Sequence, residues 1–149
     1  MDLAKFRTEA ALEDEGVWIE LGEGARARVG RIGGRRYREA FQRHLKPYQK
    51  AARLGALGEA QAERILVETL ADAVLLGWEN LTLDGAAVPY ERDRARDVLA
   101  DPAYRDFRNL IVEAANEAES FRRAAERDAE KNSAPPCAGS STGAGISTS

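Results

Sequence analysis

The stretch Glu59–Leu76, EAQAERILVETLADAVLL, is the most apolar part of the chain and decides its fold. Its core-forming side chains recur at spacings of three and four residues, at Ala62, Ile65, Leu66, Thr69, Leu70 and Ala73. This spacing predicts an amphipathic helix over about residues 59–76, which we expect at the centre of the hydrophobic core. Asp72 interrupts the most strongly apolar run, Ala71–Trp78, which is also far too short to span a bilayer.

Upstream of this stretch the sequence predicts another helix, over about residues 35–54. Its apolar side chains keep helical spacing, at Tyr37, Phe41, Leu45, Tyr48 and Ala52. Pro47 has no backbone N–H to donate, so it should kink this helix or divide it.

A β-hairpin is predicted before that helix, over residues 17–32. Two short runs rich in β-branched or aromatic residues flank the turn sequence Gly22-Glu23-Gly24. In the second run Ala27 and Val29 should face the core, and Arg26 and Arg28 should face solvent. Gly30 suggests a bulge or a break at the end of the strand.

Downstream of the apolar stretch, residues 78–91 contain the turn-forming pairs Asp84-Gly85 and Pro89-Tyr90, and we expect an ordered loop. A brief helix is predicted over about residues 91–100. Asp101-Pro102 then provides a capping acid and a proline at the first helical position, which predicts a long helix over about residues 102–131. This helix carries an apolar stripe at Tyr104, Phe107, Ile111, Ala114, Ala118, Phe121 and Ala125.

These elements predict a mainly α (α+β) protein, with a short N-terminal β-hairpin followed by a compact bundle of about four helices. One globular domain is expected over residues 17–132, because 149 residues with 44% hydrophobic content suit a single core. Residues 1–16 are expected to form a loosely ordered arm. Residues 133–149 are uncharged and consist mainly of Ser, Thr, Gly, Ala and Pro, so we expect a disordered tail there.

Charge is unevenly distributed along the chain. The net charge is -3, yet the segment Arg26–Arg53 holds ten basic residues and one acid, Glu39. The candidate basic surface consists of Arg35, Arg36, Arg38, Arg43, Lys46 and Lys50. These side chains could bind a phosphate backbone. The stronger alternative is a solvated face, or a dock for the chain's own acidic part or for an acidic partner, because the aromatic residues between them fall on the apolar face.

The residue types give little support to catalysis. His44 is the only histidine and Cys137 the only cysteine, so neither an intrachain disulfide nor a Cys/His zinc site is expected. A hydrolase triad is not supported, because His44 is remote in sequence from the serines of the tail. The turn at Gly22-Glu23-Gly24 superficially matches a dinucleotide-binding loop, but a strand is predicted after it where that motif requires a helix. We therefore expect a non-enzyme with no catalytic residue, no cofactor and no metal site.

A local signature follows the apolar helix: Trp78-Glu79-Asn80-Leu81, then Asp84-Gly85, then Val88-Pro89-Tyr90, then Val98-Leu99-Ala100-Asp101. It resembles the tail assembly chaperones of siphophages and related prophages. The similarity continues through Phe107 and Phe121 to Glu130-Lys131-Asn132-Ser133, and upstream through the predicted hairpin. In such proteins a hydroxyl residue often follows the Tyr90 position, where this chain has Glu91. Five signature residues are expected to have structural roles: Trp78, Asp84, Gly85, Pro89 and Tyr90.

The resemblance implies a role in tail morphogenesis. Such chaperones coat the tape-measure protein, help recruit tail-tube subunits around it, and leave before the tail is complete. They would therefore act in the cytoplasm of the bacterial host and be absent from the mature virion, which fits an N-terminus without the apolar run of a signal peptide. Homo-oligomerisation, a nucleic-acid-binding role for Arg26–Arg53 and a role as a structural minor tail component remain as alternatives; we expect no membrane partner.

The client of such a chaperone suggests where it binds. A tape-measure protein exposes apolar helical surface, so a partner should offer an apolar groove rimmed by charge. The second half of the predicted long helix gives the candidate partner-binding residues Ala114, Ala118, Phe121 and Ala125. The alternative is that these positions pack within the chain itself, and for the first half of the helix that alternative is preferred.

Overall fold

The computed structural model describes residues 1–132, so the tail predicted at 133–149 lies outside the described residues. The helices are α1 (Ala10–Glu15), α2 (Arg35–Leu45), α3 (Gln49–Arg53), α4 (Glu59–Ala73), α5 (Arg92–Ala100), α6 (Arg105–Asn116) and α7 (Ala118–Asn132). Short 3-10 helices are η1 (Leu3–Phe6), η2 (Lys46–Tyr48) and η3 (Pro102–Tyr104). The strands are β1 (Val17–Gly22), β2 (Ala25–Val29), β3 (Leu75–Glu79), β4 (Thr82–Leu83) and β5 (Ala86–Ala87). The predicted mainly helical α+β fold is confirmed.

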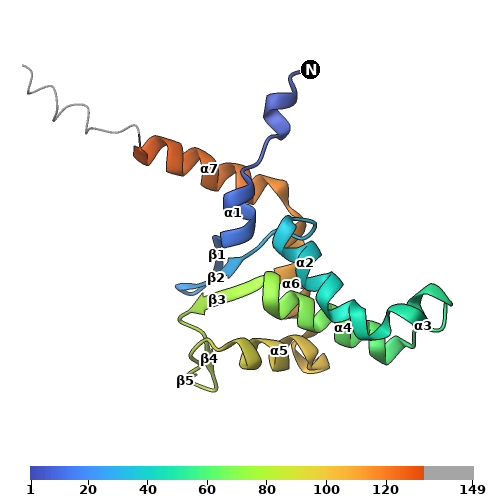
Figure 1. The fold of residues 1–149 in the computed structure, drawn as a ribbon. Coiled ribbons are helices and arrows are strands. Elements are labelled where there is room, and N and C mark those ends of the chain that lie inside the picture. The colour runs from blue at the N-terminus through green and yellow to red at the C-terminus, as the bar shows by residue number, and fades with distance from the viewer. Residues whose placement is uncertain (133–149) are drawn as a thin grey trace, which may run out of the picture.

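A three-stranded antiparallel sheet, in the order β1-β2-β3, organises the helices (Figure 1). In Figure 1 α1 and α7 lie together at one end of the molecule and α5 lies at the other. Ala25, Ala27 and Val29 of β2 are buried, whereas Arg26 and Arg28 are partly exposed. This alternation is the one that the sequence predicts for a strand with one face on the core.

Strand β3 corrects the prediction of one helix over residues 59–76. Helix α4 ends at Ala73, and Leu75–Glu79 pairs with β2, so Trp78 lies in a strand and not in a loop. Leu75, Leu76, Gly77 and Trp78 are all buried, so they do not alternate between apolar and polar. A strand buried on both faces cannot be distinguished from the end of a buried helix by periodicity.

The connection from β2 to α2 contains a close approach of two backbones. The N–H of Gly30 donates to the carbonyl of Val74 over 2.9 Å. A Cβ on Gly30 would lie 2.1 Å from the carbonyl oxygen of Ala73. The glycine that sequence analysis marked as a break therefore allows the end of β2 to meet the end of α4.

Two other predicted elements are subdivided. Pro47 divides the helix predicted at 35–54 into α2, η2 and α3. In the segment expected as a loop, β4 and β5 form a small hairpin around Asp84 and Gly85, whose φ angles are 50° and 84°. Two successive positive φ angles are typical of the turns that Asp-Gly favours in two-residue hairpins.

The long helix predicted over residues 102–131 is interrupted. The Asp101 side chain accepts a hydrogen bond from the N–H of Ala103, as its capping role requires, but α6 ends at Asn116. Glu117 is extended, with φ −84° and ψ 103°, and α7 begins after it. The change of direction lets the side chains of Ile111 and Phe121 be fully buried in two different clusters.

The main core joins α4 to the sheet and to α5 and α6. Its fully buried members include Val29, Leu70, Leu75, Leu99 and Ile111. A second, smaller cluster contains Val17, Phe121 and Ala124, with Leu12 and Ile19 packed against it. None of the helices formed by residues 1–132 has the length and hydropathy that a membrane crossing requires.

Candidate functional site

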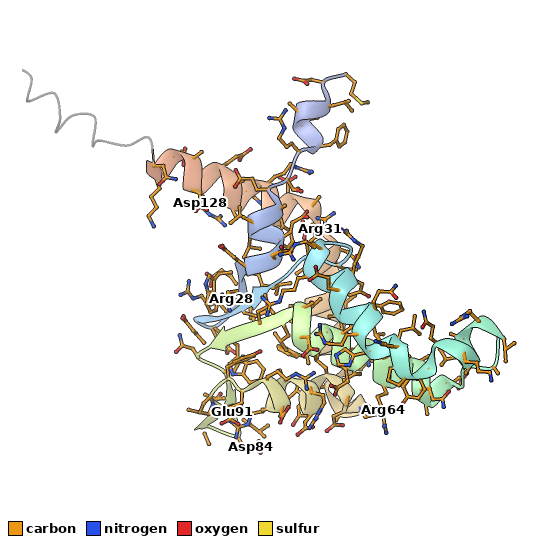
Figure 2. All side chains as sticks on the ribbon, viewed as in Figure 1. Arg28, Arg31, Arg64, Asp84, Glu91 and Asp128 are labelled. Atoms are coloured by element: carbon orange, nitrogen blue, oxygen red, sulfur yellow. The ribbon has the colours of Figure 1, made fainter. Side chains whose placement is uncertain are left out.

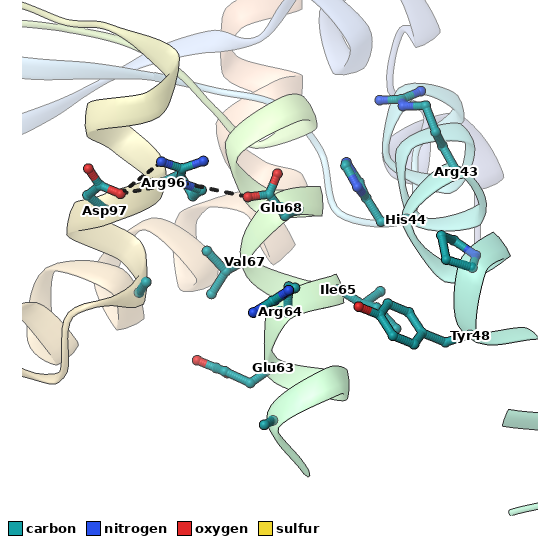
Figure 3. Close-up of a pocket in the computed structure, with 13 residues that line it drawn as sticks. Arg43, His44, Tyr48, Glu63, Arg64, Ile65, Val67, Glu68, Arg96 and Asp97 are labelled. Atoms are coloured by element: carbon teal, nitrogen blue, oxygen red, sulfur yellow. Dashed lines mark hydrogen bonds and ion pairs between the residues drawn. The ribbon is translucent and has the colours of Figure 1, made fainter. Parts of the chain in front are cut away.

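A groove of about 690 Å³ runs along α4, between a wall formed by α2 with η2 and a wall formed by α5 (Figure 3). Its apolar part contains Pro47, Tyr48, Ile65 and Val67. Ile65 and Val67 are buried, so they form the floor. Charged side chains from both walls and from α4 surround this floor, among them Arg43, Glu63, Arg96 and Asp97.

The carboxylate of Asp72, on α4, forms hydrogen bonds with side chains of both α2 and α5. Arg43 and His44 of α2 both contact its Oδ2, and the distance from Arg43 Nη2 is 3.0 Å. Arg92 of α5 donates from Nε to Oδ1 over 2.8 Å. The backbone carbonyl of Asp72 also accepts from Arg36 Nε over 3.1 Å. A single residue of α4 therefore holds both neighbouring helices in place.

A second carboxylate of α4 extends this network along α5. Glu68 lies one helical turn before Asp72, at the border between the buried and the solvent-facing sides of α4. Arg92 Nη2 donates to Glu68 Oε2 over 2.7 Å, and Arg96 Nε lies 3.8 Å from Glu68 Oε1. Arg96 also donates to Asp97 within α5. We call Arg43, His44, Glu68, Asp72 and Arg92 the Asp72 network.

Burial and hydrogen bonding act in opposite directions on these groups. Burial alone would raise the pKa of Asp72, but hydrogen bonds from His44, Arg92 and Arg43 outweigh it and hold the pKa below its ordinary value. Burial would likewise lower the pKa of Arg92, and its bonds to Glu68 and Asp72 raise it instead. These two shifts favour the charged forms of Asp72 and Arg92, so the ion pair between them is maintained at neutral pH.

The groove is lined by charged and apolar side chains. Its lining residues carry no Ser, Thr or Cys that could act as a nucleophile beside His44. Among residues 1–132, no three His, Cys, Asp or Glu side chains are grouped so as to hold a metal ion. An apolar floor between charged walls is suited to a polypeptide with an apolar face.

The predicted basic surface is divided by the chain's own acids. Arg35 donates to Asp14 over 2.6 Å, and Arg36 donates to the backbone carbonyl of Asp14 over 3.0 Å. Arg43 belongs to the Asp72 network, and Arg38 donates to the backbone carbonyl of Gly33. In contrast, the side chains of Lys46 and Lys50 are exposed and make no hydrogen bond or ion pair with residues 1–132.

The predicted signature residues lie between the end of β3 and the start of α5, and none of them lines the groove. Trp78 donates from Nε1 to the carbonyl of Val88 over 2.6 Å, and the Tyr90 hydroxyl donates to the carbonyl of Leu75 over 2.9 Å. The Trp78 and Tyr90 rings meet edge to face at 5.1 Å. Asp84 and Gly85 form the turn, and the carbonyl of Pro89 accepts from Arg94 over 2.8 Å. The contacts of Tyr90 with Leu75 and Trp78 hold the 78–91 segment against β3.

The predicted partner-binding residues are not one exposed surface. Phe121 is fully buried in the second cluster, where Arg31 lies over its ring at 5.5 Å, so in this structure it packs within the chain, the alternative that the sequence left open. Ala114 is partly buried against the main core. Ala118 and Ala125 are partly exposed on α7. Phe121 is covered because the break at Glu117 turns α7 back toward β1.

The structure brings together residues that sequence analysis did not select. Asp72, Glu68 and Arg92 are as far as 24 residues apart in sequence yet share hydrogen bonds. The signal available for Asp72 was a lone acid within an apolar run, which indicates a buried partner of opposite charge. That signal does not say which of the many arginines is the partner.

A model of one protein family, described as YdaY prophage protein, matches residues 32–132. The matched part begins after β2 and ends with α7, so it contains the whole groove and the Asp72 network. Comparisons with curated proteins and with solved structures gave no match.

Proposed function

The chain belongs to the YdaY prophage protein family, and from this premise we propose that it is a non-catalytic tail assembly chaperone. It would bind the tape-measure protein, help recruit tail-tube subunits, act in the cytoplasm of the bacterial host, and leave before the virion is mature. A prophage origin and the similarity of the Trp78–Tyr90 segment to such chaperones support this role.

The observation that carries the proposal is the groove beside α4. Its apolar floor and charged walls are the features that a carrier of apolar helices needs. The walls are held by ion pairs between α2, α4 and α5, so the groove is formed before a client arrives. A preformed site loses less conformational entropy on binding than one that must be ordered by its ligand.

The test is co-expression with fragments of the tape-measure protein encoded by the same prophage. The wild-type chain should keep at least one helical fragment soluble and should co-purify with it. Ala60→Trp places a large side chain in the groove and should abolish this effect. Ala62→Trp is the matched control, because Ala62 is also exposed on α4 but does not line the groove.

Three outcomes would count against this role. Failure with every tape-measure fragment would refute the client, and equal effects of the two tryptophans would refute the groove as its site. The presence of the chain in purified virions would favour a structural tail component. A nucleic-acid-binding role would instead predict retention on DNA that falls steeply with salt and disappears when Arg35, Arg36 and Arg38 are changed to Glu.

A further inference from the structure

We infer that the groove takes an amphipathic helix with acidic side chains along one flank, and that this flank lies on the side of the α2–η2 wall. The inference rests on the proposed function for the groove as the client's site. Beyond that function, the client helix is acidic on one flank, and this flank has a fixed orientation in the groove.

The first observation is a group of basic side chains without partners. The side chains of Lys46, Lys50, Arg53 and Arg64 are exposed, and none of these side chains makes a hydrogen bond or an ion pair with residues 1–132. Arg64 lines the groove and points away from α4 without a partner (Figures 2 and 3). We call these four residues the free basic group. Exposed bases that the chain leaves unneutralised are available to an acidic partner.

The position of this group is the second observation. Lys46 belongs to η2, whose Pro47 and Tyr48 line the groove, and α3 continues directly from η2. Lys50 follows Lys46 by four residues and Arg53 follows Lys50 by three, so the spacing suits one edge of a helical segment. Arg64 therefore lines the groove itself, and Lys46, Lys50 and Arg53 lie in the segment that includes and follows its η2 wall.

The opposite wall differs in its charge balance. Asp97 is paired with Arg96, and Arg96 also lies near Glu68. Glu63 of α4, which also lines the groove, accepts two hydrogen bonds from Arg108, and these hold the pKa of Glu63 below its usual value. The charged side chains of the α5 wall are thus paired, whereas Lys46 and Lys50 beside the α2–η2 wall are not. A helix in the groove would meet net positive charge on one flank only.

The same features favour a polypeptide over a nucleic acid. Acidic and basic side chains alternate around the groove, so it offers a phosphate backbone no continuous row of positive charge. The floor formed by Ile65 and Val67 is apolar and offers phosphate no hydrogen-bond donor. An apolar helical stripe can cover this floor while acids on its flank reach the lysines.

The test uses two synthetic helical peptides of about four turns. Both carry the same Leu/Ile stripe; one has Glu and the other has Lys along the same flank. Fluorescence anisotropy measures their binding to the full chain. We expect the Glu peptide to bind about tenfold more tightly, because rim charges set specificity and association rate. The double variant Lys46→Glu/Lys50→Glu should reverse the preference.

The control is Arg105→Glu/Arg127→Glu, which reverses two exposed and unpartnered bases outside the groove. It should keep the preference for the Glu peptide. Equal binding of both peptides, or a preference that survives the Lys46/Lys50 reversal, would overturn the inference. So would duplex DNA that binds the wild type more tightly than the Glu peptide and loses binding in the same double variant.

The inference and the proposed function can fail separately. If the Lys46/Lys50 variant keeps tape-measure fragments soluble as well as the wild type does, the chaperone role stands and the acidic flank is refuted. If no fragment is kept soluble but the Glu peptide preference follows Lys46 and Lys50, the acidic flank stands and the tape-measure client is refuted.

Discussion

Gly30 lies where the end of β2 meets the end of α4, and its hydrogen atom occupies space that a methyl group cannot. We predict that Gly30→Ala destabilises the fold by about 3 kcal/mol, because the new Cβ would lie 2.1 Å from a backbone carbonyl oxygen that has little freedom to move. Urea unfolding followed by circular dichroism measures this loss. Gly77→Ala is the control, since its Cβ would meet nothing closer than 3.7 Å. Similar losses in both variants would refute the explanation.

Asp72 should make the stability of the protein depend on acid. Its pKa lies below the ordinary value of 3.8, so the folded state gains stability above that pH and loses it as the pH falls through the lowered pKa. We predict that Asp72→Asn costs about 2 kcal/mol at pH 7, because Arg92 and Arg43 lose a shared acceptor. Between pH 7 and pH 3 the variant should lose less stability than the wild type.

The control for this measurement is Asp128→Asn on α7. Asp128 is exposed and forms no ion pair with residues 1–132, so its variant should follow the wild type at both pH values. If Asp72→Asn and the wild type lose the same stability on acidification, the network does not cause the acid sensitivity.

At the scale of elements, the break between α6 and α7 determines what Phe121 does. We predict that Phe121→Ala costs about 3–5 kcal/mol, because a fully buried ring is removed from a small cluster. Hydrogen exchange should show that α7 and α1 lose protection first, while α4 and α5 keep theirs. Leu110→Ala is the control on α6, where the side chain is 43% exposed and its loss should cost under about 1 kcal/mol.

The same elements show what local sequence can and cannot predict. The spacing of Ile65, Leu66, Leu70 and Ala73 predicted α4, and the alternation in β2 predicted its buried face, since both signals lie within a few residues. The change from α4 to β3 left no local signal, because both are apolar throughout. The break at Glu117 has no Gly or Pro to mark it, and Phe121 beyond the break packs with Val17, about a hundred residues away.

The candidate site was predictable only in part, for a similar reason. The basic stretch is evident in the sequence, and acids of the chain, Asp14 and Asp72, dock against it as expected. The candidate partner-binding residues were on the last predicted helix, and nothing in the sequence predicted the groove between α2, α4 and α5. A groove depends on how helices pack against one another, and the spacing of residues in one helix does not contain that information.

At the scale of the whole molecule, the part of the chain that folds cooperatively should be longer than the part that matches the family. The match begins at residue 32, yet β2 is the middle strand of the sheet and its Ala27 and Val29 are fully buried. We predict that a chain of residues 32–149 shows no cooperative thermal transition, because β3 loses its partner and the main core is opened. Circular dichroism during heating provides the measurement.

A shorter deletion is the control for this prediction. Residues 1–9 are exposed apart from the partly buried Thr8, so a chain of residues 10–149 should unfold within a few degrees of the full chain. A cooperative transition of the 32–149 chain near the melting temperature of the full chain would mean that the hairpin is dispensable for folding.

The three donors that share Asp72 also constrain how this family can diverge. A guanidinium left near the core without its acid costs more than a pair of apolar side chains that fill the same space. Evolutionary change at Asp72 should therefore be correlated with change at Arg92, and more weakly with change at the better exposed Arg43. A lineage that acquires leucine in place of the acid is expected to have lost the arginine of α5 beforehand or at the same time.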